Sequence, residues 1–337
     1  MPLGTKKILP SQSKVDEAVA LIKRFQSGEI TPIDTGNEWI NRHALGGLLP
    51  GTILTIGGMS NHGKTHLMSN IESHILSTQK DVKLIRCNWE SNVYKLIVRR
   101  MKAETGMKMS EILFNEFTGE EARIFEKIIS EERSEQVMYM EEPEKADVFL
   151  NELGELLQQP EARDSKVLVS IDHVGLTPGR EKAAQDALFE SMNALKKSHP
   201  FLCFLPLIQM RRDGILQRID NPNTHYPQQV DFYGTDQLFQ LSDLVLAVFQ
   251  PARLGIQDRY MLFKQDDYEY LRKKDLSFFT DYGTNSSAFV PEGNIFYHAV
   301  KSRDIDDLSD FQGVWVEQLY EKKDSAPTPS PSVDIFD

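Results

Sequence analysis

Cysteine is scarce in this chain of 337 residues, which contains only Cys87 and Cys203. Each lies in an apolar run typical of a buried strand, so the sequence predicts two buried free thiols rather than a disulfide or a thiolate metal site. The eight histidines are scattered without the spacing of metal ligands. We therefore expect no metal site built from cysteine or histidine.

Long apolar runs are also missing. No stretch approaches the ~20 consecutive apolar residues that cross a bilayer, and residues 1–7 lack the apolar core of a signal peptide. We therefore expect a cytoplasmic protein without a membrane partner. The composition, 40% hydrophobic and 26% charged, suits a globular domain with a sizeable buried core.

Positive charge is in deficit, since 38 lysines and arginines stand against 50 aspartates and glutamates and the net charge is −12. This argues against a surface coated with nucleic-acid-binding cations, but it leaves open a local basic lining in a groove or channel. Much of the acidic charge falls in the helix-like segments 116–135 and 141–155. We expect these carboxylates on solvated helix faces.

One glycine-bounded motif carries a clear chemical signal. Residues 58–65 read Gly-Met-Ser-Asn-His-Gly-Lys-Thr and follow the apolar run 52–56, which matches a phosphate-binding loop between a strand and a helix. Its backbone N–H groups can face phosphates, Lys64 can reach the terminal phosphates, and the hydroxyl of Thr65 can bind Mg²⁺. The sequence therefore predicts binding of ATP with Mg²⁺ through Gly58, Ser60, Asn61, His62, Gly63, Lys64, Thr65 and His66.

Apolar runs alternate with helix-length segments along the chain, a pattern typical of a parallel sheet covered by helices. The expected helices include 64–77, 93–105 and 185–197, where apolar residues recur at helical spacing. The sequence thus predicts an α/β nucleotide-binding core. Its expected strands are 53–56, 82–87, 136–140, 167–171, 201–207 and 244–249, followed by 295–301 and 314–320.

Three segments lie outside the expected core. Residues 13–26 predict a short amphipathic helix in an amino-terminal arm, 1–40, whose apolar face packs either on its own domain or on a neighbouring subunit. Within an ATPase domain at 41–320, the aromatic and charged stretch 253–293 reads as an insertion. The Pro/Ser-rich end, 321–337, has the composition of a disordered acidic tail.

Polar residues stand where the expected strands end, at the edge of a parallel sheet where ligands gather. Glu90 follows the strand 82–87 and can orient an attacking water. Asp172 closes the strongly apolar run 167–171, as an acidic residue of a Mg²⁺ shell does. Gln209 follows the strand 201–207 and can sense the terminal phosphate.

Cations gather at two further places. The loop 211–229 carries Arg211, Arg212 and Arg218 together with an aromatic residue, which suits contact with single-stranded nucleic acid or an exposed loop without a ligand. Lys301 and Arg303 close a late strand far in sequence from the phosphate-binding loop. Such a pair can act on a nucleotide bound by another subunit.

Taken together, these motifs resemble the motor domain of the DnaB-type replicative helicases, a hexameric family with a RecA-like P-loop core and a mostly parallel sheet. The resemblance covers about residues 13–320. It rests on segments that follow one another in the family's order, namely 33–36 with 45–51, the phosphate-binding loop, 89–99, 171–176, 207–212, 240–243 and 301–303.

The resemblance implies a role for each candidate residue. Glu90 would be the catalytic base, Asp172 the Mg²⁺ ligand beside Thr65, and Gln209 the γ-phosphate sensor, while Lys301 and Arg303 would act in the neighbouring subunit's site. The helix 13–26 would dock on that neighbour, which favours a hexameric ring. The partner would be single-stranded DNA, with Arg211, Arg212, Arg218, Tyr233 and Gly234 as candidate contacts.

The chain departs from the family pattern in three respects. The family's amino-terminal helical domain is absent, which suggests an origin in a phage or mobile element. The DNA-contact loop, which in the family carries an arginine and an acidic residue before a glycine, reads Phe-Tyr-Gly-Thr-Asp at 232–236, and the insertion 253–293 is long. In the tail, the apolar residues Val333, Ile335 and Phe336 suggest recruitment of a replisome partner.

We therefore expect a ring-forming, ATP-dependent DNA helicase that acts in replication. Two alternatives remain open at the level of sequence. One is a RecA/RadA-like recombination or repair ATPase, which shares the core, and the other is an ATP-driven assembly switch that is indifferent to DNA.

Overall fold

The computed structural model describes most of the chain. The described residues are 11–140, 145–159, 165–178, 182–199, 201–221, 224–233, 236–256, 260–264, 279–282, 286–289, 293–303 and 314–318. Gly234 and the tail residues Val333, Ile335 and Phe336 lie outside them, as does most of the expected insertion 253–293.

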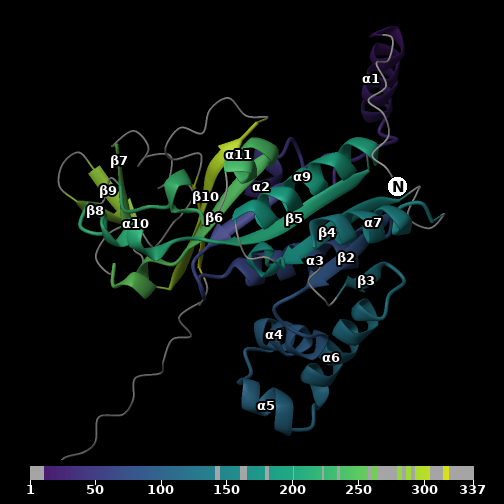
Figure 1. Cartoon of the computed structure of the whole chain (residues 1–337). Helices are drawn as coiled ribbons and strands as arrows, with labels where there is room; N and C mark the ends of the chain where they lie inside the picture. Colours follow the sequence, from purple (N-terminus) through teal and green to yellow (C-terminus); the bar gives the residue numbers. More distant parts are fainter. Residues whose placement is uncertain are drawn as a thin grey trace, which may run out of the picture.

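One mixed sheet of eight strands, counted over the described residues, organises the molecule (Figure 1). Its order is β11-β10-β6-β1-β5-β4-β2-β3, and the strands from β6 to β3 pair in parallel, whereas β10 and β11 are antiparallel. The carboxyl ends of the parallel strands therefore meet at one edge. The strands are β1 (Leu54–Gly58), β2 (Val82–Asn88), β3 (Val137–Met140), β4 (Lys166–Asp172), β5 (Leu202–Gln209), β6 (Leu244–Phe249), β10 (Asn294–Ser302) and β11 (Val314–Gln318).

Both faces of the sheet are buried under helices. In β4, Val167 and Val169 belong to one apolar core and Leu168 to the other, because successive side chains of a strand point to opposite faces. The first core includes residues of α7 (Ala146–Leu156), α9 (Lys182–Ser198) and α11 (Asp236–Leu241). The second includes residues of α2 (Glu38–His43) and α3 (Lys64–Thr78). Such two-sided burial explains the nearly continuous apolar sequence of the central strands.

A helical subdomain is inserted between β2 and β3. It consists of α4 (Val93–Thr105), α5 (Met109–Phe114) and α6 (Gly119–Glu132), which pack around a small core of their own that includes Met101 and Ile128. In Figure 1 these three helices extend away from the sheet on the side opposite α9. The subdomain keeps its own small core, so its attachment to the sheet depends on other contacts.

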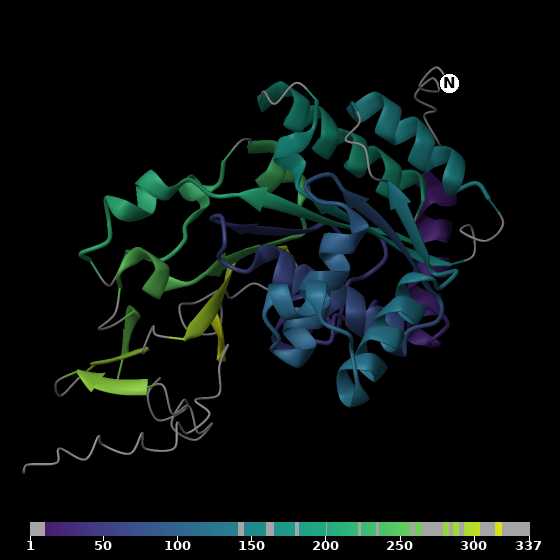
Figure 2. The same ribbon diagram turned by 90° about the horizontal axis from the view of Figure 1, so that it is seen from below.

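Two elements lie at the periphery. The helix α1 (Ser11–Gln26) stands beyond the end of the sheet in both views (Figures 1 and 2), and Val15, Val19 and Ile22 are 56%, 43% and 55% exposed. A separate antiparallel sheet is formed by β7 (Tyr260–Lys264), β9 (Ser286–Phe289) and β8 (Phe279–Tyr282). The described part of the expected insertion 253–293 thus contributes a small sheet of its own.

The structure confirms the α/β class and the elements expected from the apolar pattern. Each expected strand and helix coincides with an observed one, with bounds that differ by a few residues. Cys87 and Cys203 are free and buried, as expected. Among the helices described, none has the length and apolar character that crossing a membrane requires. The proposed division at residues 40 and 320 stays a prediction.

The expectation of solvated acidic helix faces is wrong at the end of α6. Glu132 is 5% exposed and binds Arg86 of β2, which is itself 1% exposed and also binds Glu72 of α3 at 3.0 Å. Burial by itself lowers the pKa of Arg86, but the carboxylates of Glu72 and Glu132 outweigh it and raise that pKa. These charges join the sheet, the helix that follows the phosphate-binding loop, and the helical subdomain.

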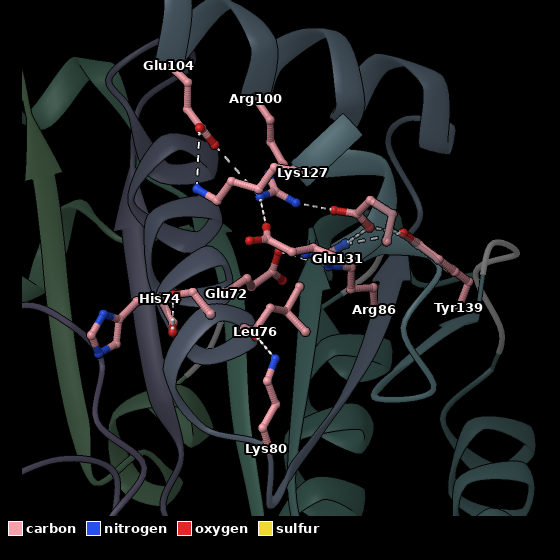
Figure 3. A network of polar contacts seen from close by, with 12 residues as sticks. Glu72, His74, Leu76, Lys80, Arg86, Arg100, Glu104, Lys127, Glu131 and Tyr139 are labelled. Atoms are coloured by element: carbon pink, nitrogen blue, oxygen red, sulfur yellow. Dashed lines mark hydrogen bonds and ion pairs between the residues drawn. The ribbon is translucent and has the colours of Figure 1, made fainter. Parts of the chain in front are cut away.

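Figure 3 shows how this charge cluster extends into the subdomain. Arg100 of α4 donates to Glu132 at 2.5 Å and also pairs with Glu131, while the hydroxyl of Tyr139 on β3 donates to Glu132. Buried charges are tolerated when each has partners of opposite sign, and sequence periodicity cannot reveal such pairing. The cluster is therefore the polar attachment of α4 and α6 to the sheet.

We predict that Arg86→Met lowers the free energy of unfolding by about 3–5 kcal/mol, because it leaves Glu72 and Glu132 buried without their cation. Denaturation by urea measures this loss. The control is Arg123→Met, since Arg123 and its partner Glu120 are 76% and 68% exposed and such pairs contribute at most about 1 kcal/mol. Equal losses in both variants would contradict the assignment.

Candidate nucleotide and motor site

The phosphate-binding loop lies where the sequence predicts it, between the end of β1 and the start of α3. Gly63, the residue before α3, has φ +104°, a conformation that glycine adopts without strain. A Cβ atom on Gly58 would lie 2.8 Å from the carbonyl oxygen of Val248 on β6. The glycines at both ends of the motif are thus required by backbone conformation and by the close approach of the neighbouring strand.

Lys64 is folded over the loop. Its Nζ donates to the carbonyl oxygens of Gly58 at 2.9 Å and Met59 at 3.1 Å. Burial lowers the pKa of Lys64, while the charges of Asp172 and Glu90 act in the opposite direction. The ammonium group therefore stands above the loop, where phosphate oxygens can replace the two carbonyl groups.

Asp172 lies beside the first turn of α3. Thr65 Oγ1 donates to Asp172 Oδ2 at 3.1 Å, whereas Asp172 Oδ1 is buried and has no hydrogen-bond partner among the described residues. Burial raises the pKa of the Asp172 carboxyl to about 6, the charge of Glu90 adds to this effect, and Thr65 and Arg99 oppose it. A carboxylate and a hydroxyl side by side, with one buried oxygen left over, fit the oxygen ligands that Mg²⁺ prefers.

Glu90 and Gln209 reach the same edge from different strands. The backbone N–H of Glu90 donates to the carbonyl of Asp172 at 3.0 Å, so the exposed Glu90 side chain starts beside Asp172. Gln209 ends β5 opposite Gly58, and its Nε2 donates to Ser60 Oγ at 2.8 Å. The sheet thus brings together the loop, Glu90, Asp172 and Gln209, which are separated along the sequence.

The rings of two predicted nucleotide contacts are engaged elsewhere. His62 is buried, its Nδ1 accepts from the backbone N–H of Gln250 at 2.9 Å, and its ring stacks on Phe249. Burial lowers the pKa of His62 to about 4, and the charges of Arg253, Lys64 and Arg212 act in the same direction. His66 Nε2 lies 3.8 Å from a carboxylate oxygen of Glu317 on β11. For these two residues the backbone N–H groups, rather than the rings, are available to phosphates.

The candidate DNA-contact residues separate into two groups. Arg218 binds the buried Asp231 at 2.7 Å and donates to the carbonyl of Thr224 at 2.8 Å, so its guanidinium holds the loop together. Arg211 and Arg212 are exposed at the start of α10 (Arg212–Leu216), and the Arg211 guanidinium lies 5.3 Å from the centre of the Tyr233 ring. Only the second group presents its side chains to solvent.

Lys301 and Arg303 lie at the opposite edge of the sheet from the loop. Ser302 pairs with Leu244 on β6, whereas Gly58 pairs with Val248, a separation of roughly 13 Å along that strand. The cations are therefore remote from the nucleotide loop of their own chain.

Both cations are held by the end of α11. Lys301 Nζ donates to the carbonyl of Ser242 at 2.7 Å, and burial, helped by the charge of Arg303, lowers the pKa of Lys301 to about 8. Arg303 donates to Asp243 Oδ1 at 2.9 Å, and Asp243 also accepts from Lys196. The part played by Asp243, like that of Arg99 near Asp172, was not foreseen from the sequence, because only the fold brings these charges together.

We predict that Asp172→Asn raises the thermal unfolding midpoint of the nucleotide-free protein in chelator at about pH 8. Because the folded-state pKa is raised from 3.8 to about 6, ionised Asp172 disfavours the folded state. The gain from asparagine should be absent below about pH 4, grow up to about pH 6 and then stay constant. Scanning fluorimetry across pH measures it, with the exposed Asp147→Asn as control. A gain that is independent of pH would contradict the burial of this carboxyl.

Comparison with known proteins agrees with this geometry. No curated protein matches the chain in a sequence search. The fold is similar to a solved helicase ATPase domain, with TM-score 0.63 and 16% identity over 90% of this chain and 93% of that one. It is also similar to a DnaB-like replicative helicase solved in a study of its interactions with primase, with TM-score 0.57 and 15% identity over 88% of this chain and 67% of that one.

At these identities the solved structures show the fold, which is that of RecA-like helicase ATPase domains. The family follows from the sequence itself. The model of the DnaB-like helicase C-terminal domain matches residues 33–273, which span the loop, Glu90, Asp172 and Gln209. The chain belongs to the DnaB-like helicase C-terminal domain family.

Proposed function

We propose that this ATP-driven DNA replication helicase works as a ring of identical subunits that moves along single-stranded DNA and hydrolyses ATP with Mg²⁺ between neighbours. One observation carries the proposal. The loop, Glu90 and Asp172 share one edge of the sheet, whereas Lys301 and Arg303 occupy the other. A complete site thus requires two copies of the chain, and repetition of such a head-to-tail contact closes a ring.

Within one subunit, four side chains divide the chemistry. Lys64 leaves the carbonyls of Gly58 and Met59 to bind the terminal phosphates. Glu90 orients the attacking water and accepts its proton, because its exposed carboxylate stands beside Asp172 at the open edge. Thr65 and Asp172 are the residues that would hold Mg²⁺, which when bound neutralises charge on the phosphates.

The neighbouring subunit supplies Arg303, whose guanidinium stabilises the charge that develops on the phosphates during transfer. In the single chain this guanidinium is bound to Asp243 and to the end of α11. Docking onto a neighbour therefore exchanges an internal ion pair for the phosphates of that neighbour's nucleotide. Lys301, held by the carbonyl of Ser242, supports Arg303 from the same strand end.

Coupling to DNA runs through Gln209. Its side chain contacts Ser60 of the nucleotide loop, and its backbone carbonyl accepts from the N–H of Tyr233 at 3.0 Å. Tyr233 in turn lies against Arg211. A change at the terminal phosphate is thus only two residues away from the basic surface that we assign to single-stranded DNA.

The helix α1 supplies the contact that holds neighbours together. Val15, Val19 and Ile22 form an exposed apolar stripe on a helix that stands apart from its own domain in both views (Figures 1 and 2). An amphipathic helix of this length needs a surface that covers its apolar stripe. The neighbouring subunit is the partner that the ring provides.

The family match does not favour either alternative function. A recombination ATPase and an assembly switch would share the nucleotide loop, but the matched family is one of helicases. The proposed recruitment of a replisome partner by the tail concerns Val333, Ile335 and Phe336, which lie outside the described residues, and stays a hypothesis tested by deleting 322–337 and measuring partner capture.

We predict that the wild-type protein separates a labelled forked duplex with Mg²⁺ and ATP, and that Lys64→Ala does not, because it removes the phosphate-binding cation. Arg303→Ala should lose turnover and keep nucleotide binding. Mixing the two inactive variants should restore ATP turnover, because roughly a quarter of the contacts in a randomly mixed ring then combine an intact Lys64 with an intact Arg303. If no turnover returns on mixing, Arg303 does not act between subunits.

We predict that Val19→Asp converts rings to monomers in analytical ultracentrifugation with nucleotide, because it places a charge in the exposed stripe of α1. Ala20→Asp is the matched control, since Ala20 faces away from that stripe on the same helix. Rings that persist in Val19→Asp would show that α1 does not hold neighbours together.

A further inference from the structure

An exposed tyrosine marks the basic surface beside the nucleotide loop. Tyr233 is 52% exposed, Val230 is 71% exposed and Leu216 is 37% exposed, and all three stand near the exposed Arg211 and Arg212. Large apolar side chains are an unusual choice for contacts to phosphates alone, which need only cations and N–H donors. The combination of an aromatic ring with cations is the one that binds the bases of a single strand.

The tyrosine is held in a fixed place. Its backbone N–H donates to Gln209 at 3.0 Å, and the backbone N–H of Arg211 donates to the carbonyl of Asp231 at 2.6 Å. The adjacent Phe232 is buried, packs edge to face on Phe239, and lies so close to β1 that a Cβ on Gly57 would be 2.1 Å from its ring. The ring of Tyr233 therefore projects from a rigid part of the loop.

The neighbouring cation prepares the ring for a nucleotide. The Arg211 guanidinium lies over the Tyr233 ring at 5.3 Å from its centre, a cation–π contact that limits rotation of both side chains. With half of its surface still exposed, the ring can stack on a base while the guanidinium remains beside the phosphate of that nucleotide.

We propose that Tyr233 binds single-stranded DNA by stacking on a base, with Arg211 at the adjoining phosphate. This inference rests on the proposed DNA-translocating function and specifies how the strand is held. It also accounts for the departure of residues 232–236 from the family pattern, because a stacking ring replaces the charged contact there. Since Tyr233 is bonded to Gln209, the stacked base is linked to the residue that touches Ser60 of the nucleotide loop.

The test separates base stacking from phosphate binding. Fluorescence anisotropy with a non-hydrolysable ATP analogue compares an oligothymidylate with an oligomer of equal length in which abasic tetrahydrofuran units replace the nucleosides. Both carry the same phosphate charge, so only stacking distinguishes them. We expect wild type to prefer oligothymidylate by about ten-fold, the value for one stacked base. Tyr233→Ala should lose this preference and Tyr233→Phe should keep it.

The controls guard against a general loss of structure. Tyr94→Ala removes a tyrosine of similar exposure, 54%, from α4 and should keep the preference. Binding of a fluorescent ATP analogue should be the same in all variants. A preference that persists in Tyr233→Ala would overturn the stacking assignment and leave the helicase function intact. Binding of neither oligomer by wild type would overturn both.

Discussion

The parallel hydrogen bonding of β1 to β5 on one side and to β6 on the other places every functional residue of this chain. Gly58 pairs with Gln209 and with Val248, so the end of β1, the sensor glutamine and the strand that leads toward the cations are fixed in one register. A shift of two residues would keep the apolar faces buried but would separate Ser60 from Gln209. The backbone ladder, rather than any single side chain, therefore assembles the site.

The same register imposes the need for a second subunit. Because β10 runs antiparallel to β6, the strand that ends in Lys301 and Arg303 delivers them to the edge opposite the nucleotide loop. Asp243 and the end of α11 hold the two cations there. A motor built this way cannot complete its site alone, so hydrolysis becomes dependent on contact between neighbours, and sequential hydrolysis around a ring can follow.

Buried charge connects the nucleotide helix to the helical subdomain. Glu72 lies on α3, the helix that begins at Lys64, and through Arg86 and Glu132 it reaches α6. Charges that are buried and fully paired are rigid, because each would be costly to expose or to leave alone. A movement of α3 on nucleotide binding would consequently be passed to the subdomain, whereas an apolar contact could slip.

The sequence by itself determined the α/β class, the nucleotide loop and the residues Glu90, Asp172 and Gln209, because apolar periodicity and position at strand ends are local properties. It did not determine that His62 turns into the core, that Arg218 binds Asp231, or that Glu132 is buried against Arg86. These facts depend on partners that are distant in the chain, and a charged side chain looks the same in sequence whether it is solvated or paired. Only the tertiary structure decided which charges are internal and which face a ligand, because burial and pairing arise when strands and helices meet in space.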